Sequence, residues 1–463
     1  MDLEQSFLSI GIDDVDTPGG GCTTHFGALL VTYLTKNHKC TLLDYPLLTR
    51  LNPGVPWKTR GNASVTLRLD TECFNTPMEA LDLVSSLIES YQGGCRHRNS
   101  RPGIVVFKGK PWSNMLRKYY TRALTDIVPL EDASRLIGKI GAVHNGGRGI
   151  IGALAGIASL APGDPYTFEL LTYRRPEYWG SKRCIDPASV WEYDVLTGEL
   201  TFSNIDHTSN TQIITPHGPD PVLYGVRSTQ PEAALWALKK ISTCEPIHNW
   251  CLYRTNQATS IHEITIDTPR YYRTGKYRCT ITKQPKRIPG GHVIVEAKCG
   301  GTPVDIAFYR ESYPLNTIAL HLTPGDKVSV VGPVKQRSFS NKPTITTEVL
   351  YIEELESIYE TVNPRCPKCG SRMKSKGTGK GFECPKCGYY TRSTGKIGIP
   401  VMRRIVSGRY TPTPMHLAHL VRPNFLKTPV LSEFPVKLAD GFCGGLLVNS
   451  PVNNPSASNG THF

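Results

Sequence analysis

Two Cys-Pro-Lys-Cys sequences constrain the fold of this chain more than any other feature. They lie at Cys366–Cys369 and Cys384–Cys387, and each is followed by a glycine, Gly370 and Gly388. Two cysteine pairs at this spacing can close a tetrahedral metal site, which is the pattern of a four-cysteine zinc ribbon. Because four thiolates leave no open coordination position, we expect a structural Zn²⁺ that holds a shape and does not catalyse. The ligands are Cys366, Cys369, Cys384 and Cys387, within a ribbon over residues 360–395.

The other ten cysteines are scattered and show no pairing pattern. The first residues contain two acids and no basic segment, so no secretory signal is expected. No apolar run is long enough to span a bilayer. We therefore predict a reducing cytoplasm and no membrane contact, and we infer no obligate protein partner. The 463 residues, 39% of them hydrophobic, are enough for roughly three or four domains.

The net charge favours a polyanionic partner. Lys and Arg number 53 against 39 Asp and Glu, which gives a formal charge of +14. A basic protein of this kind is compatible first of all with nucleic acid, although charge alone does not name the partner.

A motif near the N-terminus combines acids, glycines and hydroxyls. It runs from Ile10 to Gly27 and reads IGIDDVDTPGGGCTTHFG. The apolar pattern predicts a buried strand before the turn and a helix after it, so the turn ends at a helix N-terminus, which favours a phosphate. Carboxylates leaving the strand could hold Mg²⁺. The alternative is a tight Asp/Gly turn with Thr23 as an ordinary N-cap. The candidates are Asp13, Asp14, Asp16 and Thr23 for catalysis, and Gly20, Gly21 and Thr24 for phosphate.

Two further segments could serve the same phosphates. The loop PWKTRGN supplies Lys58 and Arg60, although each is also compatible with a solvated surface charge. The segment HNGGRGIIGALAG supplies a possible phosphate cradle of Arg148, Gly149 and Gly152. Its spacing matches neither a P-loop nor a dinucleotide fingerprint. A glycine-faced helix packed closely on a sheet is the alternative.

The order of predicted elements indicates a multidomain α+β protein. Residues 1–128 alternate strands and helices and favour an α/β layer, and residues 129–245 favour a small antiparallel sheet with helices, including a strand at Ser189–Asp194. Residues 246–356 contain short strands, from Trp250–Thr255 onward, typical of a small barrel. A Pro-Gly-Asp-Lys-Val entry to one strand suggests an OB fold, with any other small β-barrel as the alternative.

Basic and aromatic residues in the C-terminal half are candidates for RNA contact. An OB fold supplies a groove for single-stranded nucleic acid, with cations along the backbone. Residues 396–448 form a basic extension, for which a solvated arm is the alternative, and the polar tail 449–463 is expected to be disordered. The RNA-binding candidates are Lys335, Arg337, Lys374, Lys376, Tyr389, Arg392, Arg403, Arg404 and Arg409.

Taken together, these segments resemble the archaeal isoleucine-tRNA 2-agmatinylcytidine synthetase family. The resemblance rests on IGIDDVDT with GCTTHFGA, RLNPGVPWKTRGNASV, GRGIIGALAGI, HGPDPVLYGVR, RTNQAT, RIPGGHV and the zinc ribbon, in the family's order over residues 8–425. It implies a kinase-like N-terminal domain, a ferredoxin-like domain, an OB fold and a zinc ribbon. It also implies an ATP-dependent ligase that joins agmatine to C2 of the wobble cytidine in the isoleucine tRNA with a CAU anticodon, so that this tRNA reads AUA.

The implied chemistry explains the residue types. The C2 oxygen of cytosine is a poor leaving group until it is phosphorylated, after which the primary amine of agmatine can displace phosphate; ATP and Mg²⁺ are required. The resemblance places Asp13, Asp14 and Asp16 on the family's acidic motif and Thr23 on its autophosphorylated threonine, with Thr24 in support. Val15 and Gly21 depart from the family pattern.

Two readings outside this resemblance stay open. One is a non-catalytic protein that binds single-stranded nucleic acid through the OB fold and the ribbon. The other is a phosphotransferase that ligates no amine. The sequence does not place the agmatine pocket, although a carboxylate is expected to meet the guanidinium.

Overall fold

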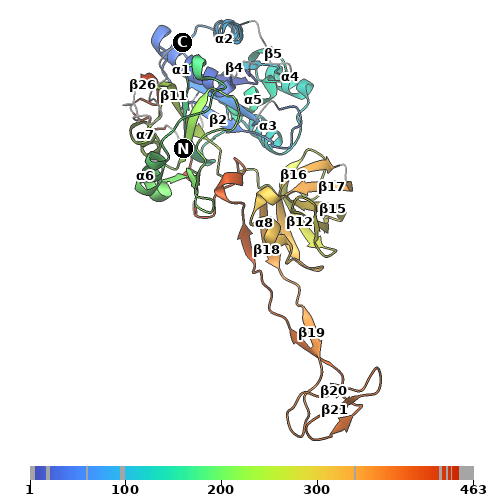
Figure 1. The fold of residues 1–463 in the computed structure, drawn as a ribbon. Coiled ribbons are helices and arrows are strands. Elements are labelled where there is room, and N and C mark those ends of the chain that lie inside the picture. The colour runs from blue at the N-terminus through green and yellow to red at the C-terminus, as the bar shows by residue number, and fades with distance from the viewer. Residues whose placement is uncertain are drawn as a thin grey trace, which may run out of the picture.

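The computed structural model describes residues 6–16, 21–58, 61–93, 100–337, 340–426, 430–433, 436–439 and 441–447. A large body carries a smaller strand-rich unit below it, from which a long arm leads to a small terminal unit (Figure 1). Three sets of residues named above lie outside the described residues: Gly20, Arg60 and the tail 449–463. Within the described part of the chain, no helix is long and apolar enough to cross a membrane.

One mixed sheet runs through the whole body. Its order is β5-β4-β1-β3-β2-β11-β6-β10-β7, with β25 beside β6 and β26 beside β11. The junction is a short parallel pairing of β11 with β2, so the N-terminal unit and the second unit share one sheet. The strands are β1 (Phe7–Asp13), β2 (Leu47–Arg50), β3 (Ala63–Leu69), β4 (Gly103–Gly109), β5 (Val143–Gly146), β6 (Pro165–Tyr173), β7 (Thr201–Phe202), β10 (Val222–Ser228), β11 (Ile247–Thr255), β25 (Val430–Leu431) and β26 (Cys443–Leu447), and β8 (Ile205–Asp206) pairs separately with β9 (Thr211–Gln212).

This sheet corrects one expectation and extends another. The strand expected at Trp250–Thr255 was assigned to the barrel, but it is part of β11 at the centre of the large sheet. The assignment was wrong because the partners of a strand come from distant parts of the chain. β5 pairs with β4, so the N-terminal unit continues past residue 128, where the sequence suggested its end.

Helices cover both faces of the N-terminal part of the sheet. Along β4, Ile104 and Val106 point into the core shared with α1 and α2, while Val105 and Phe107 point into the core shared with α3, α4 and α5. This is the side-chain alternation of a strand buried on both faces. The helices are α1 (Thr23–Asn37), α2 (Pro77–Gln92), α3 (Asn114–Thr125), α4 (Leu130–Lys139), α5 (Ile150–Ala158), α6 (Pro187–Thr197), α7 (Pro231–Lys240) and α8 (Leu315–Ala319), with short 3-10 turns η1 (Pro176–Tyr178), η2 (Gly198–Leu200), η3 (Arg310–Ser312) and η4 (Pro414–His416).

The strand expected at Ser189–Asp194 is wrong, because these residues lie in α6. The helix has a strong start signal. The Asp186 side chain accepts hydrogen bonds from the backbone N–H groups of Ala188 and Ser189, and Pro187 occupies the first turn. An Asp cap followed by proline outweighs the β preference of the valine, tryptophan and tyrosine that follow.

The smaller unit contains a closed ring of strand pairings, which we call the five-strand ring. Its order is β12-β14-β15-β17-β16, and β16 pairs back with β12. β15 and β17 are parallel, and the other neighbours are antiparallel. Apolar side chains fill the interior. The ring strands are β12 (Thr274–Ile281), β14 (His292–Cys299), β15 (Thr302–Phe308), β16 (Lys327–Arg337) and β17 (Ser340–Thr346), and β13 (Lys286–Ile288), β18 (Val349–Glu354) and β24 (Gly408–Tyr410) are added outside the ring.

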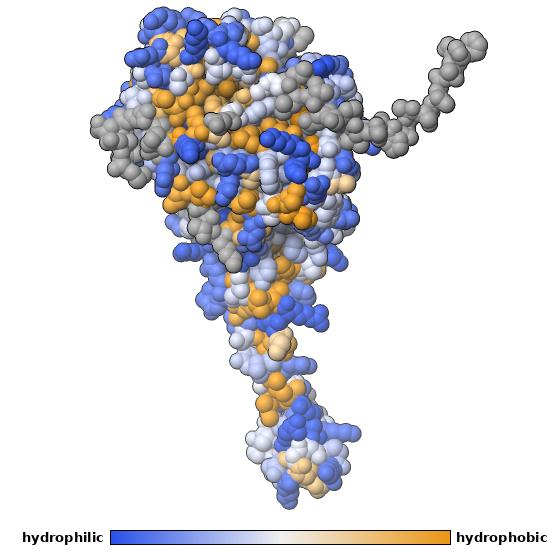
Figure 2. All heavy atoms as spheres, turned by 90° about the vertical axis from the view of Figure 1, so that its left-hand side faces the viewer, coloured by the Kyte–Doolittle hydropathy of each residue, from blue (hydrophilic) through white to orange (hydrophobic). Residues whose placement is uncertain are grey.

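The arm is a two-stranded ribbon with exposed apolar side chains. It pairs β19 (Tyr359–Val362) with β23 (Ile397–Pro400). Tyr359, Ile397 and Ile399 are each more than two-fifths exposed, and Figure 2 shows hydrophobic atoms along this narrow part of the molecule.

At the end of the arm, the four predicted zinc ligands converge. The Sγ atoms of Cys366, Cys369, Cys384 and Cys387 lie within 4.8 Å of one another. The glycines that follow the two knuckles, Gly370 and Gly388, have φ angles of 71° and 72°. Glycine adopts this left-handed conformation at little cost, which explains the repeated Cys-Gly ending. The small strands of this unit are β20 (Lys374–Ser375), β21 (Phe382–Glu383) and β22 (Tyr390–Thr391).

The cysteines outside the ribbon, which show no pairing pattern in the sequence, are mostly paired in the structure. Eight of those ten cysteines form disulfides, namely Cys40–Cys73, Cys184–Cys244, Cys251–Cys443 and Cys279–Cys299. Their sequence separations range from 20 to 192 residues, so spacing alone could not reveal them. Disulfides also occur inside the cells of hyperthermophiles, so these pairs do not by themselves fix the compartment.

Candidate functional site

A cavity of about 960 Å³ lies where the N-terminal unit, the second unit and the segment after the arm meet. It collects most of the residues proposed from the sequence for catalysis and phosphate binding. Of these, Asp13, Asp14, Asp16, Thr23, Thr24, Lys58, Arg148, Gly149 and Gly152 line the cavity. Gly21 is buried beside it but is not among the lining residues.

The acidic residues lie where β1 ends. Asp13 is the last residue of β1 and is opposite Gly103 of β4. Asp14 has a φ of 60°, which is uncommon for a residue other than glycine, and its backbone N–H donates to Asp13 Oδ1 at 2.6 Å. The backbone N–H of Arg101 donates to Asp14 Oδ2 at 2.8 Å, and Arg148 lies 3.9 Å from the same oxygen. The turn is therefore fixed by hydrogen bonds from neighbouring segments.

Burial raises the pKa of the Asp13 carboxyl well above its ordinary value, and the negative charge of Asp14 raises it further. Arg148 acts in the opposite direction but offsets these two effects only in part. Carboxylate oxygens are the preferred ligands of hard divalent cations, so the donor set fits such an ion.

The glycines of α5 allow the helix to approach Asp13 closely. A Cβ atom on Gly152 would lie 1.8 Å from Asp13 Oδ2, and one on Gly149 would lie 2.6 Å from the Asp13 carbonyl oxygen. This is the close packing of helix on sheet that the sequence offered as the alternative to a phosphate cradle. Arg148 remains at the cavity, where its Nη2 donates to the Trp57 carbonyl at 2.8 Å.

Thr23 is the first residue of α1, and Cys22 holds the N-cap position without a side-chain cap bond. Thr23 therefore does not act as the N-cap. Instead, its Oγ1 accepts a hydrogen bond from the backbone N–H of Val15 at 3.1 Å. This contact ties the hydroxyl to the acidic turn and uses the oxygen as an acceptor. Thr24 is held from the other side, since Tyr253 donates to its carbonyl at 2.6 Å.

Part of the cavity wall is the loop around the His-Gly-Pro-Asp-Pro sequence, which Arg183 holds in place. Its guanidinium donates to the carbonyl oxygens of Pro216, Gly218, Asp220 and Val222 at 2.7 to 2.9 Å. One guanidinium thus fixes four points of the loop.

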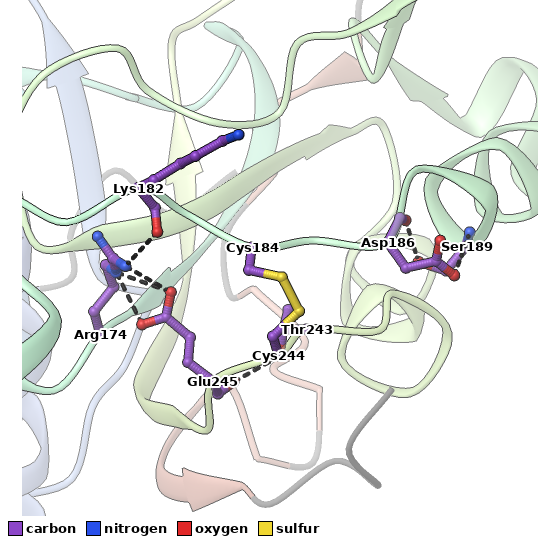
Figure 3. The surroundings of a disulfide bond; sticks show 8 residues. All are labelled: Arg174, Lys182, Cys184, Asp186, Ser189, Thr243, Cys244 and Glu245. Atoms are coloured by element: carbon purple, nitrogen blue, oxygen red, sulfur yellow. Dashed lines mark hydrogen bonds and ion pairs between the residues drawn. A yellow bond between two sulfur atoms is a disulfide. The ribbon is translucent and has the colours of Figure 1, made fainter. Parts of the chain in front are cut away.

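The next residue, Cys184, forms the disulfide with Cys244 shown in Figure 3. Beside it, the buried Arg174 Nε donates to Glu245 Oε1 and Oε2 at 3.0 and 2.9 Å. Arg174 also donates to the carbonyl oxygens of Ser181 and Lys182 at 2.8 and 3.3 Å, so the segment that carries Arg183 is anchored before it by Arg174 and after it by the disulfide.

Among the cavity residues that the sequence did not identify are four that contact one another or lie close together. Arg50, Glu169, Arg227 and His419 all line the cavity, but they come from four separate segments. No local pattern joins them. Two of them do lie in segments that carry the family resemblance. Arg50 is the first residue of RLNPGVPWKTRGNASV, and Arg227 is the last residue of HGPDPVLYGVR.

Several RNA-binding candidates make contacts inside the protein. Arg403 donates to both carboxylate oxygens of the buried Asp326 at 2.9 and 2.7 Å. Arg409 donates to Glu263 Oε1 at 3.3 Å and to the Tyr351 hydroxyl at 3.1 Å. Both placements favour a structural role, for Arg403 just after the arm and for Arg409 within β24.

The other candidates are more accessible. Lys335 is half-buried, and its neighbours include Arg337, whose guanidinium lies 5.3 Å from the Tyr309 ring centroid. On the terminal unit, Lys376 forms an exposed ion pair with Glu383. Of the remaining candidates, Lys374, Arg392 and Arg404 are exposed and Tyr389 is partly exposed.

Fold and cavity together define a multidomain α+β enzyme with a C-terminal zinc ribbon, and comparison with known proteins gives its family. Residues 9–147 match the TiaS TCKD domain, residues 147–262 the TiaS FLD domain, and residues 363–405 the TiaS C-terminal zinc ribbon domain. The chain belongs to the TiaS family of isoleucine-tRNA 2-agmatinylcytidine synthetases. The resemblance stated from the sequence is thereby confirmed.

The similarity extends over nearly the whole chain. The TiaS of Acidilobus saccharovorans is 42% identical over 94% of this chain and 98% of its own length. The TiaS of Ignisphaera aggregans is 39% identical over 93% and 95%. Among solved structures, a complex of TiaS with its isoleucine tRNA and ATP has a TM-score of 0.78 at 31% identity and covers 92% of this chain and 98% of that chain. A complex of TiaS with the same tRNA, AMPCPP and agmatine has a TM-score of 0.77 at 29% identity with the same coverage.

Proposed function

We propose that this protein joins agmatine to C2 of the wobble cytidine of the isoleucine tRNA with a CAU anticodon, at the expense of ATP, and that it does so in the cytoplasm. The observation that carries the proposal is the single cavity that brings the acidic turn, Thr23 and Arg148 together. Family membership supports it, since relatives that match 94% and 93% of the chain are isoleucine-tRNA 2-agmatinylcytidine synthetases.

The domains divide the work. The N-terminal unit is a kinase-like domain that holds ATP, and the second unit is a ferredoxin-like domain that closes the cavity. The five-strand ring is an OB fold that grips RNA. Its cyclic strand order and its size support this assignment. The zinc ribbon, at the end of the arm, meets a part of the tRNA far from the cavity (Figure 1).

The reaction has two steps. First, the C2 oxygen of cytosine takes the terminal phosphoryl group of ATP, and ADP leaves. Second, the amine of agmatine attacks C2, the new C–N bond forms, the C–O bond breaks, and phosphate leaves with the former C2 oxygen while the amine loses a proton. In each step, neutralising the negative charge on the oxygens of the phosphoryl group matters more than covalent catalysis by the protein.

The residues have distinct roles in this scheme. Asp13, Asp14 and Asp16 would hold Mg²⁺, which supplies positive charge to the phosphates when it is bound. Arg148 stabilises negative charge that develops on the transferring group. The Thr23 hydroxyl lies next to the acidic turn, in a position to accept a phosphoryl group.

A single assay separates this function from the alternatives. The protein is incubated with ATP, Mg²⁺, labelled agmatine and the CAU-anticodon transcript, and label is followed into RNA. We expect one agmatine per tRNA. Asp16→Asn should abolish incorporation and leave tRNA binding intact, while the exposed Asp82→Asn in α2 serves as a charge-matched control. Binding without incorporation would indicate a nucleic-acid-binding protein, and phosphate transfer without agmatine a phosphotransferase.

A further inference from the structure

A second group of charged side chains lines the same cavity outside the acidic motif. Arg50 ends β2, Glu169 lies in β6, Arg227 lies in β10, and His419 follows η4. Arg227 Nε donates to Glu169 Oε1 at 3.2 Å, and Arg227 Nη2 lies 3.3 Å from His419 Nδ1. Arg50 Nη2 is 3.8 Å from Glu169 Oε2. We call these four residues the Arg50–Arg227 cluster.

The cluster has a hydrogen-bond donor that no described protein group uses. Arg50 Nε is buried and has no hydrogen-bond partner among the described residues, and the ion pair of this side chain with Glu169 is a long one at 3.8 Å. A guanidinium carries five N–H donors. Burying a charged group with unmet donors is costly unless a partner satisfies them. The side chain of Arg50 is only 16% exposed, so water has little access to it.

The cluster also has excess positive charge. Two guanidinium groups face one carboxylate, and that carboxylate already accepts a hydrogen bond from Gln257 Nε2. The positive charges of Arg50 and Arg227 hold the pKa of His419 well below its ordinary value, so this imidazole is neutral. Because the Arg227 guanidinium can only donate, His419 Nδ1 must act as the acceptor in this contact. The single proton of the neutral ring therefore lies on Nε2, which is a further hydrogen-bond donor. Lys58 lies near enough to add positive potential.

We propose that the Arg50–Arg227 cluster is an oxyanion site that binds a phosphate group of the substrate and so positions the wobble nucleotide. The inference rests on the proposed function, because it assigns the cluster to a tRNA substrate. A phosphodiester has one negative charge and two free oxygens, which match the surplus charge and the planar donor geometry of guanidinium groups. Phosphate contacts of this kind fix the register of a nucleic acid without reading its sequence.

A triphosphate offers the same chemistry as an RNA backbone, so the test must distinguish the two. The variant is Arg227→Gln, with Arg227→Lys as the conservative change and the exposed Arg135→Gln in α4 as the charge-matched control. Equilibrium binding of the CAU-anticodon isoleucine tRNA transcript and of ATP is measured at several salt concentrations. We expect Arg227→Gln to weaken tRNA binding about tenfold and to lower the slope of log K against log salt by about one, with ATP affinity within about twofold.

The tRNA can be changed as well as the protein. A neutral methylphosphonate replaces the phosphodiester on either side of the wobble cytidine. At one of the two positions, the neutral linkage should weaken tRNA binding by wild-type protein about as much as Arg227→Gln weakens binding of unmodified tRNA. At that position, the neutral linkage should not weaken binding by Arg227→Gln any further. This coupling would not appear if Arg227 only supported the fold. Even if the variant fails to fold, wild-type binding that neither neutral linkage weakens would overturn the proposal.

The outcomes are separate. Loss of ATP affinity in Arg227→Gln, with tRNA binding unchanged, would overturn the assignment to RNA and support an oxyanion site that holds a phosphate of ATP. If neither affinity changes and neither neutral linkage weakens wild-type binding, the proposal is overturned and the cluster is a structural clip between units. All readouts are binding constants, so a protein that binds RNA phosphate here and yet fails to ligate agmatine would refute the proposed function alone.

Discussion

Substitution of Gly152 by alanine tests how the cavity positions Asp13. The added Cβ would lie 1.8 Å from Asp13 Oδ2 and 2.8 Å from its Cγ, whereas ordinary contact begins at 3.4 Å, so the carboxylate oxygen must retreat by about 1.6 Å. The helix cannot easily move instead, because Gly149 lies against the Asp13 carbonyl and Gly156 lies against Ser64 and Thr66.

The expected effects on stability and on activity differ in size. Overpacking costs about 1–3 kcal/mol, and the helix preference of alanine over glycine offsets roughly 0.5–1 kcal/mol of this. The net loss of unfolding free energy is therefore about 0–2.5 kcal/mol. A catalytic group displaced by this distance costs about 100-fold in rate. Agmatine incorporation under single-turnover conditions measures the rate, and urea unfolding measures the stability.

Gly138→Ala is the matched control. Gly138 lies in α4, and a Cβ atom there meets nothing within 4 Å. This variant should gain about 0.5–1 kcal/mol of stability and keep full activity. Incorporation by Gly152→Ala within about threefold of wild type, with Asp13→Asn inactive, would refute the claim that α5 sets the position of Asp13.

Three further results are expected. Cys384→Ser should lose zinc by metal analysis and bind tRNA more weakly, yet retain ATP hydrolysis in the absence of tRNA; retained zinc would contradict the ligand assignment. A reductant should lower the melting temperature, because four disulfides cross-link the fold, and an unchanged melting curve would argue against these pairs. Burial, reinforced by the charge of His248, lowers the pKa of His25 from 6.5 to about 3. Stability should therefore be full above pH 6.5 and fall by roughly 1.4 kcal/mol per pH unit on acidification toward pH 3, since the unfolded chain takes up the proton first. His25→Gln should flatten that fall in urea titrations at each pH.

Local features of the sequence predicted the structure best where the chemistry is local. The four zinc ligands and the glycines after them lie within about two dozen residues, and their spacing alone defines the ribbon. The acidic turn between β1 and α1 is likewise a continuous segment. When a strand is followed by a turn and then a helix, the carboxylates of the turn lie close together at one point of the fold, and this does not depend on the neighbouring elements.

Long-range features could not be read in the same way. The apolar segment that became β11 reads equally well as a barrel strand or as a strand of the large sheet, because hydrophobic alternation does not identify neighbours. The bond between Cys251 and Cys443 depends on β26 returning to β11 after the ribbon. The Arg50–Arg227 cluster draws on three units, and only the folded chain brings it together.

The central claim is that the cavity activates a base by transferring phosphate to its C2 oxygen. The most direct test labels that oxygen with ¹⁸O in the wobble cytidine of the CAU-anticodon isoleucine tRNA transcript and follows the label during agmatine ligation. The account predicts one labelled inorganic phosphate for each agmatine joined. Label that appears in water or in AMP while agmatine is incorporated would contradict phosphoryl activation.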